Sequence, residues 1–171
     1  MQSSDDEFDP EEVPFDPSEA IISMNSYTKK KELGVGAFGR VDLMTHTITK
    51  QAAAVKFIKT DKGYDGESFL REVGIQGSLK HPSIVKLIGL SLPTPPAFEA
   101  AIVMEYAPNG SLAANMGRLS NKQKALIIID IITGFRYIHH KGVVHRDLKP
   151  SDILLAATTT RKSATSAARV S

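Results

Sequence analysis

The sequence contains no cysteine, so disulfide bonds, thiolate metal sites and a thiol nucleophile are excluded from the start. It also lacks a long apolar run. The longest one, Ala125 to Ile132, is interrupted by Asp130 and is far shorter than the roughly 20 residues of a membrane-spanning helix. The amino terminus is acidic, whereas secretory signals begin with basic residues and mitochondrial ones avoid acids. We therefore expect a soluble, cytoplasmic protein without a membrane partner.

Basic residues are absent from the first 26 positions, which carry eight acidic residues and three prolines. This composition predicts a disordered acidic tail over residues 1–26. Residues 27–171 then hold 21 basic residues against 11 acidic ones, a net charge of +10. The bases are scattered, and only residues 29–31 form a run. A phosphate ligand or a solvated surface is therefore favoured over nucleic acid as the partner.

The rest of the chain divides into a β-rich and an α-rich region. A helix is predicted over residues 66–79, and a second one from Asn121 to His140, because apolar residues recur there every three or four positions. Alternation and turn signals predict five strands in the first region: KELG, RVDLMTHTIT, QAAAVKFIK, IVKLIGLSL and AFEAAIVMEY. Residues 156–171 are rich in Thr, Ser and Ala, which predicts an unstructured tail.

The glycines of GVGAFG, residues 34–39, form a pattern that two unrelated phosphate-binding devices share. In a dinucleotide-binding fold such glycines lead into a helix, whereas residues 40–44 here have the pattern of a strand. We therefore interpret the glycines as a hairpin whose backbone lies close over phosphates. An ordinary glycine hairpin is the alternative at this point.

Lys56 lies in a strand pattern in which alternation places it on the same face as Ala54. A lysine inside a sheet is costly unless a carboxylate pairs with it, and Glu72 on the following helix is the natural partner. The pair would hold the ammonium group against phosphate oxygens. A solvated strand lysine is the alternative.

A third motif, HRDLKPSDILL at residues 145–155, makes the set specific. With GVGAFGRV and AAVK, it resembles the ordered motifs of the protein kinase family: the glycine-rich lid, the strand lysine and the catalytic loop. The lysine after Asp147 and Leu148 is similar to that of serine/threonine kinases, and IVMEYAPNGSL resembles their tyrosine-kinase-like group. The resemblance runs from about Tyr27 to Leu155.

The resemblance implies an α+β fold of the protein-kinase type. Residues 27–103 would form a five-stranded antiparallel N-lobe with one helix, and residues 104–110 a hinge. Residues 111–155 would form an incomplete, mainly helical C-lobe that includes the catalytic loop. The implied activity is ATP-dependent phosphoryl transfer to Ser or Thr of proteins, with ATP and Mg²⁺ as cofactors and an unknown protein substrate or regulatory protein as partner.

The resemblance also implies site residues. Asp147 would be the catalytic base and Lys149 would stabilise the transferring phosphoryl group, with Asp152 as a metal ligand. The residues implied to contact ATP are Leu33, Gly34, Val35, Gly36, Ala37, Phe38, Gly39, Val41, Ala54, Lys56, Glu72, Met104, Glu105, Ala107 and Leu154. For His145 and Arg146 we expect packing and loop organisation instead of a direct chemical role.

The sequence departs from the family pattern at two points. Asp152 stands where the family has an asparagine; an ionised carboxylate still binds Mg²⁺ but cannot donate a hydrogen bond to the loop. No Asp-Phe-Gly occurs, so the family's principal Mg²⁺ ligand is missing and we expect little or no kinase activity from this polypeptide. The alternatives are a non-catalytic interaction fragment, with the acidic tail as its working part, and the product of a damaged gene.

Two further expectations concern the carboxyl-terminal half. Ile128, Ile132, Phe135 and Ile138 fall on a helix that in the family packs against later helices, so we expect them to be exposed. Residues 156–171 are interpreted as a frame-shifted form of the Asp-Phe-Gly segment. One back-translation gives CNNYTKICDFGRTRQ in the alternative frame, with the motif near the expected position. An unrelated low-complexity tail is the other interpretation, and the coding DNA decides between them.

Overall fold

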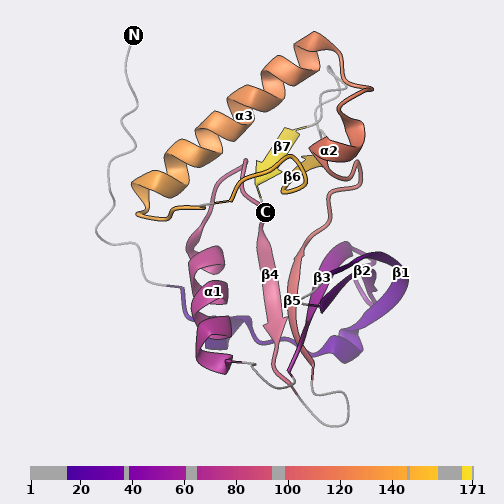
Figure 1. The fold of residues 1–171 in the computed structure, drawn as a ribbon. Coiled ribbons are helices and arrows are strands. Elements are labelled where there is room, and N and C mark those ends of the chain that lie inside the picture. Colours follow the sequence, from indigo (N-terminus) through magenta and orange to yellow (C-terminus); the bar gives the residue numbers. More distant parts are fainter. Residues whose placement is uncertain are drawn as a thin grey trace.

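The amino-terminal part of the chain is a five-stranded antiparallel sheet with the strand order β1-β2-β3-β5-β4 (Figure 1). The computed structural model describes residues 15–36, 39–60, 65–93, 99–145, 147–157 and 167–170. The strands are β1 (Tyr27–Gly36), β2 (Gly39–His46), β3 (Ala52–Lys59), β4 (Leu87–Ser91) and β5 (Glu99–Glu105). The predicted number of strands and their antiparallel arrangement are confirmed.

The helix α1 (Gly66–Ser78) follows β3, within one residue of the predicted range. Its N-cap is Asp65, whose side chain accepts a hydrogen bond from the backbone N–H of Glu67. Phe69 and Val73, four residues apart on one face, are buried against one side of the sheet. This packing presents α1 beside the face that carries the even-numbered residues of β3.

Residues 15–26, part of the predicted disordered tail, are ordered in the structure, so the prediction is wrong for this stretch. They form two short 3-10 turns, Pro17–Ala20 and Met24–Ser26. Ile22 and Met24 pack against the side of the sheet opposite α1. Composition alone does not indicate this packing, in which a few apolar residues of an acidic segment become partly buried on an existing sheet. Residues 1–14 lie outside the described part of the chain.

The carboxyl-terminal part contains α2 (Leu112–Asn115), α3 (Asn121–His140) and a hairpin of β6 (Ile153–Ala156) with β7 (Ala167–Val170). The prediction of an unstructured tail over 156–171 therefore does not hold for β7, which finds its partner in β6; residues 158–166 are not described. Four buried residues of this part form a cluster with Ile84, which lies in the segment before β4: Ile127, Ile138, Ile153 and Leu155.

The helix α3 has the predicted bounds, and its start is fixed by a capping box between Ser120 and Gln123. Ile128 and Ile132 are exposed, as expected, at 55% and 60%. Ile138 is buried at 3% and Phe135 is partly buried, so the expectation was wrong for these two. Ile138, eleven residues after Ile127, lies on the stripe of α3 that faces the core. Phe135 lies closer to the outer stripe, which is formed by the exposed Ile128, Ile129 and Ile132, and is only partly covered by the core.

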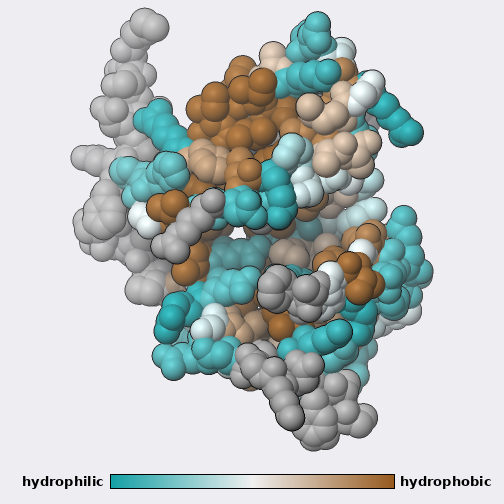
Figure 2. Space-filling view, viewed as in Figure 1, coloured by the Kyte–Doolittle hydropathy of each residue, from teal (hydrophilic) through white to brown (hydrophobic). Residues whose placement is uncertain are grey.

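The outer stripe of α3 forms part of an apolar surface in the upper part of Figure 2. Among the described residues, no helix is both long enough and apolar enough to cross a membrane.

Candidate functional site

A cleft of about 790 Å³ lies between the sheet and the carboxyl-terminal part (Figure 2). The sheet contributes residues that point to the α1 side, and the rest come from α1, the segment before β4, the segment after β5, the loop before β6 and β6 itself. The lining residues are Lys31, Leu33, Gly34, Val41, Ala54, Lys56, Glu72, Gln76, Val85, Ile102, Met104, Glu105, Tyr106, Ala107, Pro108, Asn109, Gly110, Ser111, Ser151 and Leu154.

The glycine motif forms the tip of the hairpin between β1 and β2, as the interpretation as a hairpin requires. Gly36 pairs with Gly39 across the tip, and Gly34 lines the cleft. Gly39 has a φ of +145°, and an added Cβ there would overlap the carbonyl oxygen of Phe57, so this position requires glycine. Val35 is 68% exposed and is not among the residues that line the cleft. Ala37 and Phe38 lie outside the described residues.

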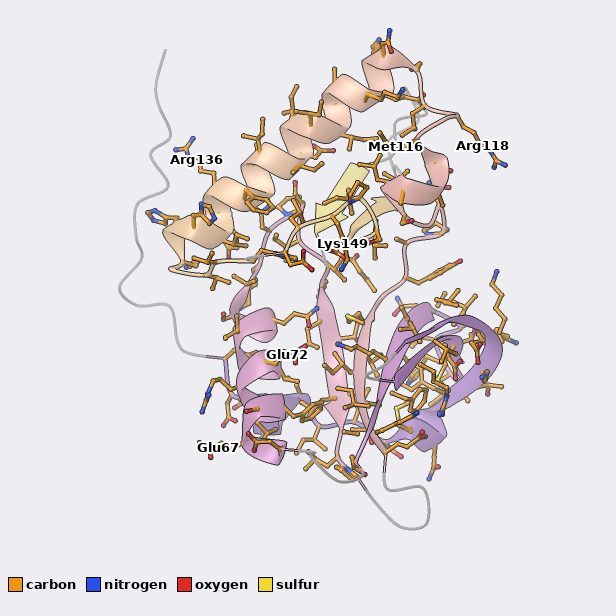
Figure 3. The ribbon with its side chains drawn as sticks, viewed as in Figure 1. Glu67, Glu72, Met116, Arg118, Arg136 and Lys149 are labelled. Carbon is orange, nitrogen blue, oxygen red and sulfur yellow. The ribbon has the colours of Figure 1, made fainter. Side chains whose placement is uncertain are left out.

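Lys56 and Glu72 form an ion pair at the inner end of the cleft. The distance from Lys56 Nζ to Glu72 Oε1 is 3.6 Å, and the side chains are 37% and 58% exposed. Lys56 shares its face of β3 with Ala54, which also lines the cleft, so the alternation argument is confirmed. Figure 3 shows Glu72 on α1, below the segment that carries Lys149. The ammonium group is thus paired but still open to an anion in the cleft.

The segment after β5 forms the outer wall of the cleft. The carboxylate of Glu105 accepts a hydrogen bond of 2.8 Å from the backbone N–H of Lys86, so this carboxylate is tied to the sheet. Asn109 N donates to Leu155 O at 3.2 Å, and Leu155 N donates to Gly110 O at 2.8 Å. These bonds join the segment to β6 and so bring Leu154 to the opposite wall of the cleft.

The loop before β6 brings the three predicted polar residues together. Lys149 Nζ lies 3.2 Å from Asp147 Oδ2, and the backbone N–H of Lys149 donates to Asp152 Oδ2 at 3.2 Å. The hydrogen bond to Asp147, aided by the nearby charge of Asp152, raises the pKa of Lys149. Asp152 therefore organises the loop as an acceptor, which a carboxylate can do as well as an amide can.

The described residues contain no cluster of three or more acidic or histidine side chains suited to hold a metal ion. His145 contributes to the loop through its backbone, because its carbonyl accepts a hydrogen bond of 2.8 Å from Asp147 N. Its ring lies at a centroid distance of 6.3 Å from that of Phe135, consistent with the expected packing role. Arg146 lies outside the described residues.

Most of the predicted cleft residues are brought together, but several lining residues were not predicted. Gln76 lies one turn after Glu72 on α1, so helical spacing from Glu72 was a signal that could have found it. Lys31 and Val85 had no such signal, because their places depend on how β1 and the segment before β4 cross the cleft. Gly36 and Gly39 are in the hairpin but not among the lining residues.

Comparison with known proteins shows similarity to protein kinases over the part of the chain that carries these motifs. The sequence profile of the protein kinase domain matches residues 27–164. The chain is 34% identical over 148 residues to a probable serine/threonine-protein kinase, MARK-C, of Dictyostelium discoideum, covering 84% of this chain and 19% of that protein. It is 39% identical over 132 residues to the serine/threonine-protein kinase SRK2D of Arabidopsis thaliana, covering 75% and 35%.

A third relative is CBL-interacting protein kinase 11 of Oryza sativa subsp. japonica, which is 34% identical over 140 residues, covering 78% of this chain and 27% of that protein. The chain thus spans less than two-fifths of the length of each of these curated relatives. The profile match covers most of the chain and includes the hairpin, the ion pair and the loop described above. The chain therefore belongs to the protein kinase family.

Proposed function

We propose that this chain binds ATP in the cleft between the sheet and the carboxyl-terminal part. The observation that carries the proposal is the Lys56–Glu72 pair, which holds an ammonium group at the inner end of a cleft that is otherwise largely apolar. A volume of about 790 Å³ lies within the range of ligand sites. The cation matches the phosphates and the apolar walls match the base, so the residues present fit the nucleotide.

Within the cleft, the base would lie between Val41 and Ala54 on the sheet side and Leu154 on the other side. Its polar edge would meet the backbone of residues 105–107, which lines the cleft. The Glu105 carboxylate would take no part in this, because it accepts the Lys86 N–H. The phosphates would extend toward Lys56, under the glycines of the hairpin. Asp152 is the residue that would hold Mg²⁺, which commonly binds one or two carboxylates together with phosphate oxygens.

For phosphoryl transfer, we assign Asp147 as the base that accepts the proton of a Ser or Thr hydroxyl. Lys149, kept protonated by its neighbours, would lie against the transferred group. Bound Mg²⁺ would neutralise the charge that develops on the phosphate oxygens. The printed sequence contains no Asp-Phe-Gly, so we expect this polypeptide by itself to bind nucleotide and to transfer little phosphate. We assign no protein substrate.

Nucleotide binding is tested by titrating a fluorescent N-methylanthraniloyl ATP with Mg²⁺ into the wild-type chain and into Lys56→Met. Loss of a charge-assisted contact with phosphate is expected to weaken binding by at least about tenfold. Lys59→Met is the matched control, because it removes the same charge from the same strand at a position outside the cleft lining. Equal affinity, or equal absence of binding, in wild type and Lys56→Met would contradict the proposal.

The rival function is a non-catalytic interaction protein in which the partial kinase fold is a binding surface and the acidic segment is the working part. One observation favours an exposed binding surface. Three isoleucines of α3 stand exposed, which suits contact with another protein. Deletion of the whole of residues 1–26 would not discriminate cleanly between the two functions, because Ile22 and Met24 pack on the sheet. Removing only residues 1–14 keeps that packing and separates the two functions: ATP binding stays, while partner capture is lost only under the rival function.

Two finer assignments remain proposals. Membership of the tyrosine-kinase-like group rests on IVMEYAPNGSL alone, and the relatives named above add no support for it. The frame-shift origin of residues 156–171 rests on the spacing from Asp147.

A further inference from the structure

Residues 15–22, here called the strap, pass along α1 and place two side chains next to glycines of that helix. An added Cβ at Gly77 would overlap the aromatic ring of Phe15. At Gly74, one turn earlier, an added Cβ would lie 3.7 Å from Pro17 Cγ. The two glycines that interrupt the helical pattern of α1 therefore coincide with its contacts with the strap. At Gly77, the absence of a side chain allows the strap to lie closer to the helix backbone than a larger residue would permit.

The strap is also tied to the edge strand of the sheet. Ile21 forms a parallel bridge with Leu90 of β4, and Ile22 N donates to Leu90 O at 2.8 Å. A third glycine, Gly89, makes room here, because an added Cβ would come within 2.8 Å of Ala20 O. Backbone bonding thus covers the open edge of β4 and fixes one end of the strap. Figure 1 shows this segment passing α1 and β4 on its way to β1.

The contacts of the strap with α1 lie next to the residue that pairs with Lys56. Gly74 and Gly77 come two and five residues after Glu72, within the same two turns of helix. The Glu72 carboxylate is 58% exposed, and its distance of 3.6 Å to Lys56 Nζ is already long for an ion pair. A small displacement of α1 away from the sheet would therefore separate the two groups. Whatever holds α1 against the sheet also sets this distance.

We infer that Phe15 and Pro17 are positioning residues, which hold α1 so that Glu72 keeps Lys56 in place for a nucleotide. The inference rests on the nucleotide binding proposed above. The strap links the edge of β4 to α1 without touching the cleft, since neither residue is among those that line it. Its effect on a bound nucleotide must therefore pass through the helix.

The first test is amide hydrogen exchange of α1 in the full chain, with no nucleotide present. Phe15→Ala is expected to raise the exchange rate of residues 66–78 by about tenfold, since an opening free energy lowered by 1.4 kcal/mol changes rates by that factor. Met24→Ala is the matched control, because it removes a similar apolar side chain that packs on the opposite side of the sheet. Phe15→Leu, which keeps most of the apolar contact, should stay close to wild type.

The second test is a cycle of nucleotide affinities with the same fluorescent ATP. Phe15→Ala is expected to weaken binding by about threefold in the wild-type background and by nothing further in a Glu72→Gln background, because both changes act through one pair. A merely structural role would instead weaken binding equally in both backgrounds. Met24→Ala should leave the affinity unchanged in either background.

The outcomes separate the two proposals. Equal ATP affinity of wild type and Lys56→Met refutes the proposed nucleotide binding. Unchanged hydrogen exchange of α1 in Phe15→Ala refutes the positioning role, whether or not nucleotide binds. Equal acceleration of α1 exchange by Phe15→Ala and Met24→Ala also overturns the inference, because it shows general destabilisation. If Phe15→Ala does not fold, Pro17→Ala carries the comparison, and wild-type exchange and affinity in Pro17→Ala would again refute the inference.

Discussion

At the scale of single residues, two glycines of one helix have opposite surroundings. Both reduce helix stability by about 1 kcal/mol relative to alanine when only propensity is considered. Gly74 has room for a methyl group, since an added Cβ would lie at an ordinary contact distance of 3.7 Å from Pro17. At Gly77 the same methyl group would meet the ring of Phe15, which must then move.

We therefore expect Gly74→Ala to stabilise the chain by about 1 kcal/mol, and Gly77→Ala to gain nothing or to destabilise it. Urea unfolding followed by circular dichroism measures both. Combining Gly77→Ala with Phe15→Ala removes the clash, so the alanine should then recover the benefit that propensity predicts. Equal stabilisation by Gly74→Ala and Gly77→Ala in the wild-type background would show that Phe15 does not rest on α1.

The residues of the ion pair could be predicted from the sequence, because strand alternation and the position of the following helix were enough to join Lys56 to Glu72. The ring of Phe15 against Gly77 could not, because that contact joins residues 62 positions apart with no periodic relation. The same holds for Asp42. It is buried to 1% exposure and paired with Lys29 and Arg40, an arrangement that only the strand register decides.

At the scale of elements, α1 depends on its amino-terminal cap. The Asp65 carboxylate accepts hydrogen bonds from Ser68 Oγ and from the backbone N–H of Glu67. The bonds from Ser68 contribute most to lowering the pKa of Asp65 below its ordinary value of 3.8. Because the folded state favours the ionised carboxylate, the stabilisation is present above the ordinary pKa and is lost as the pH falls through the lowered one.

We expect Asp65→Asn to remove this pH dependence while keeping a cap, since asparagine caps helices as well as aspartate does. Helix content measured by circular dichroism between pH 5 and pH 2, about the range over which such carboxylates titrate, compares the two chains. Relative to the variant, the wild type should lose helix only as the pH falls below 3.8. Parallel titration curves would show that the Asp65 charge contributes nothing to α1.

Elements with their own periodicity were predicted well, as α3 shows with bounds that match the prediction at both ends. The ordered residues 15–26 and the strand β7 were not, because each is stabilised by a partner that lies elsewhere in the sequence. Ile22 hydrogen-bonds to the edge of β4, and β7 pairs with β6. Composition describes what a segment can do by itself, and these segments are ordered only on an existing surface.

At the scale of the whole molecule, the cleft follows from the order of three sequence motifs, but the position of its wall at β6 follows from the packing of α3 against β6 and against Ile84, in the segment before β4. The same packing decides which side of α3 faces outward. Its inner stripe, with Ile127 and Ile138, closes the core of the carboxyl-terminal part. Its outer stripe leaves Ile128, Ile129 and Ile132 at 55%, 55% and 60% exposure.

This outer stripe predicts self-association of the purified chain, because covering apolar area contributes about 25 cal/mol for each Å² removed from water. Sedimentation velocity of the wild type should show species that grow with protein concentration. Ile132→Glu places a charge on the stripe and should restore a monomer without unfolding the chain, since the side chain is 60% exposed. Ile48→Glu, at an isoleucine 82% exposed in the turn between β2 and β3, makes the same chemical change elsewhere and should leave association intact. A wild type that stays monomeric at every concentration, or equal effects of the two substitutions, would show that α3 does not drive association.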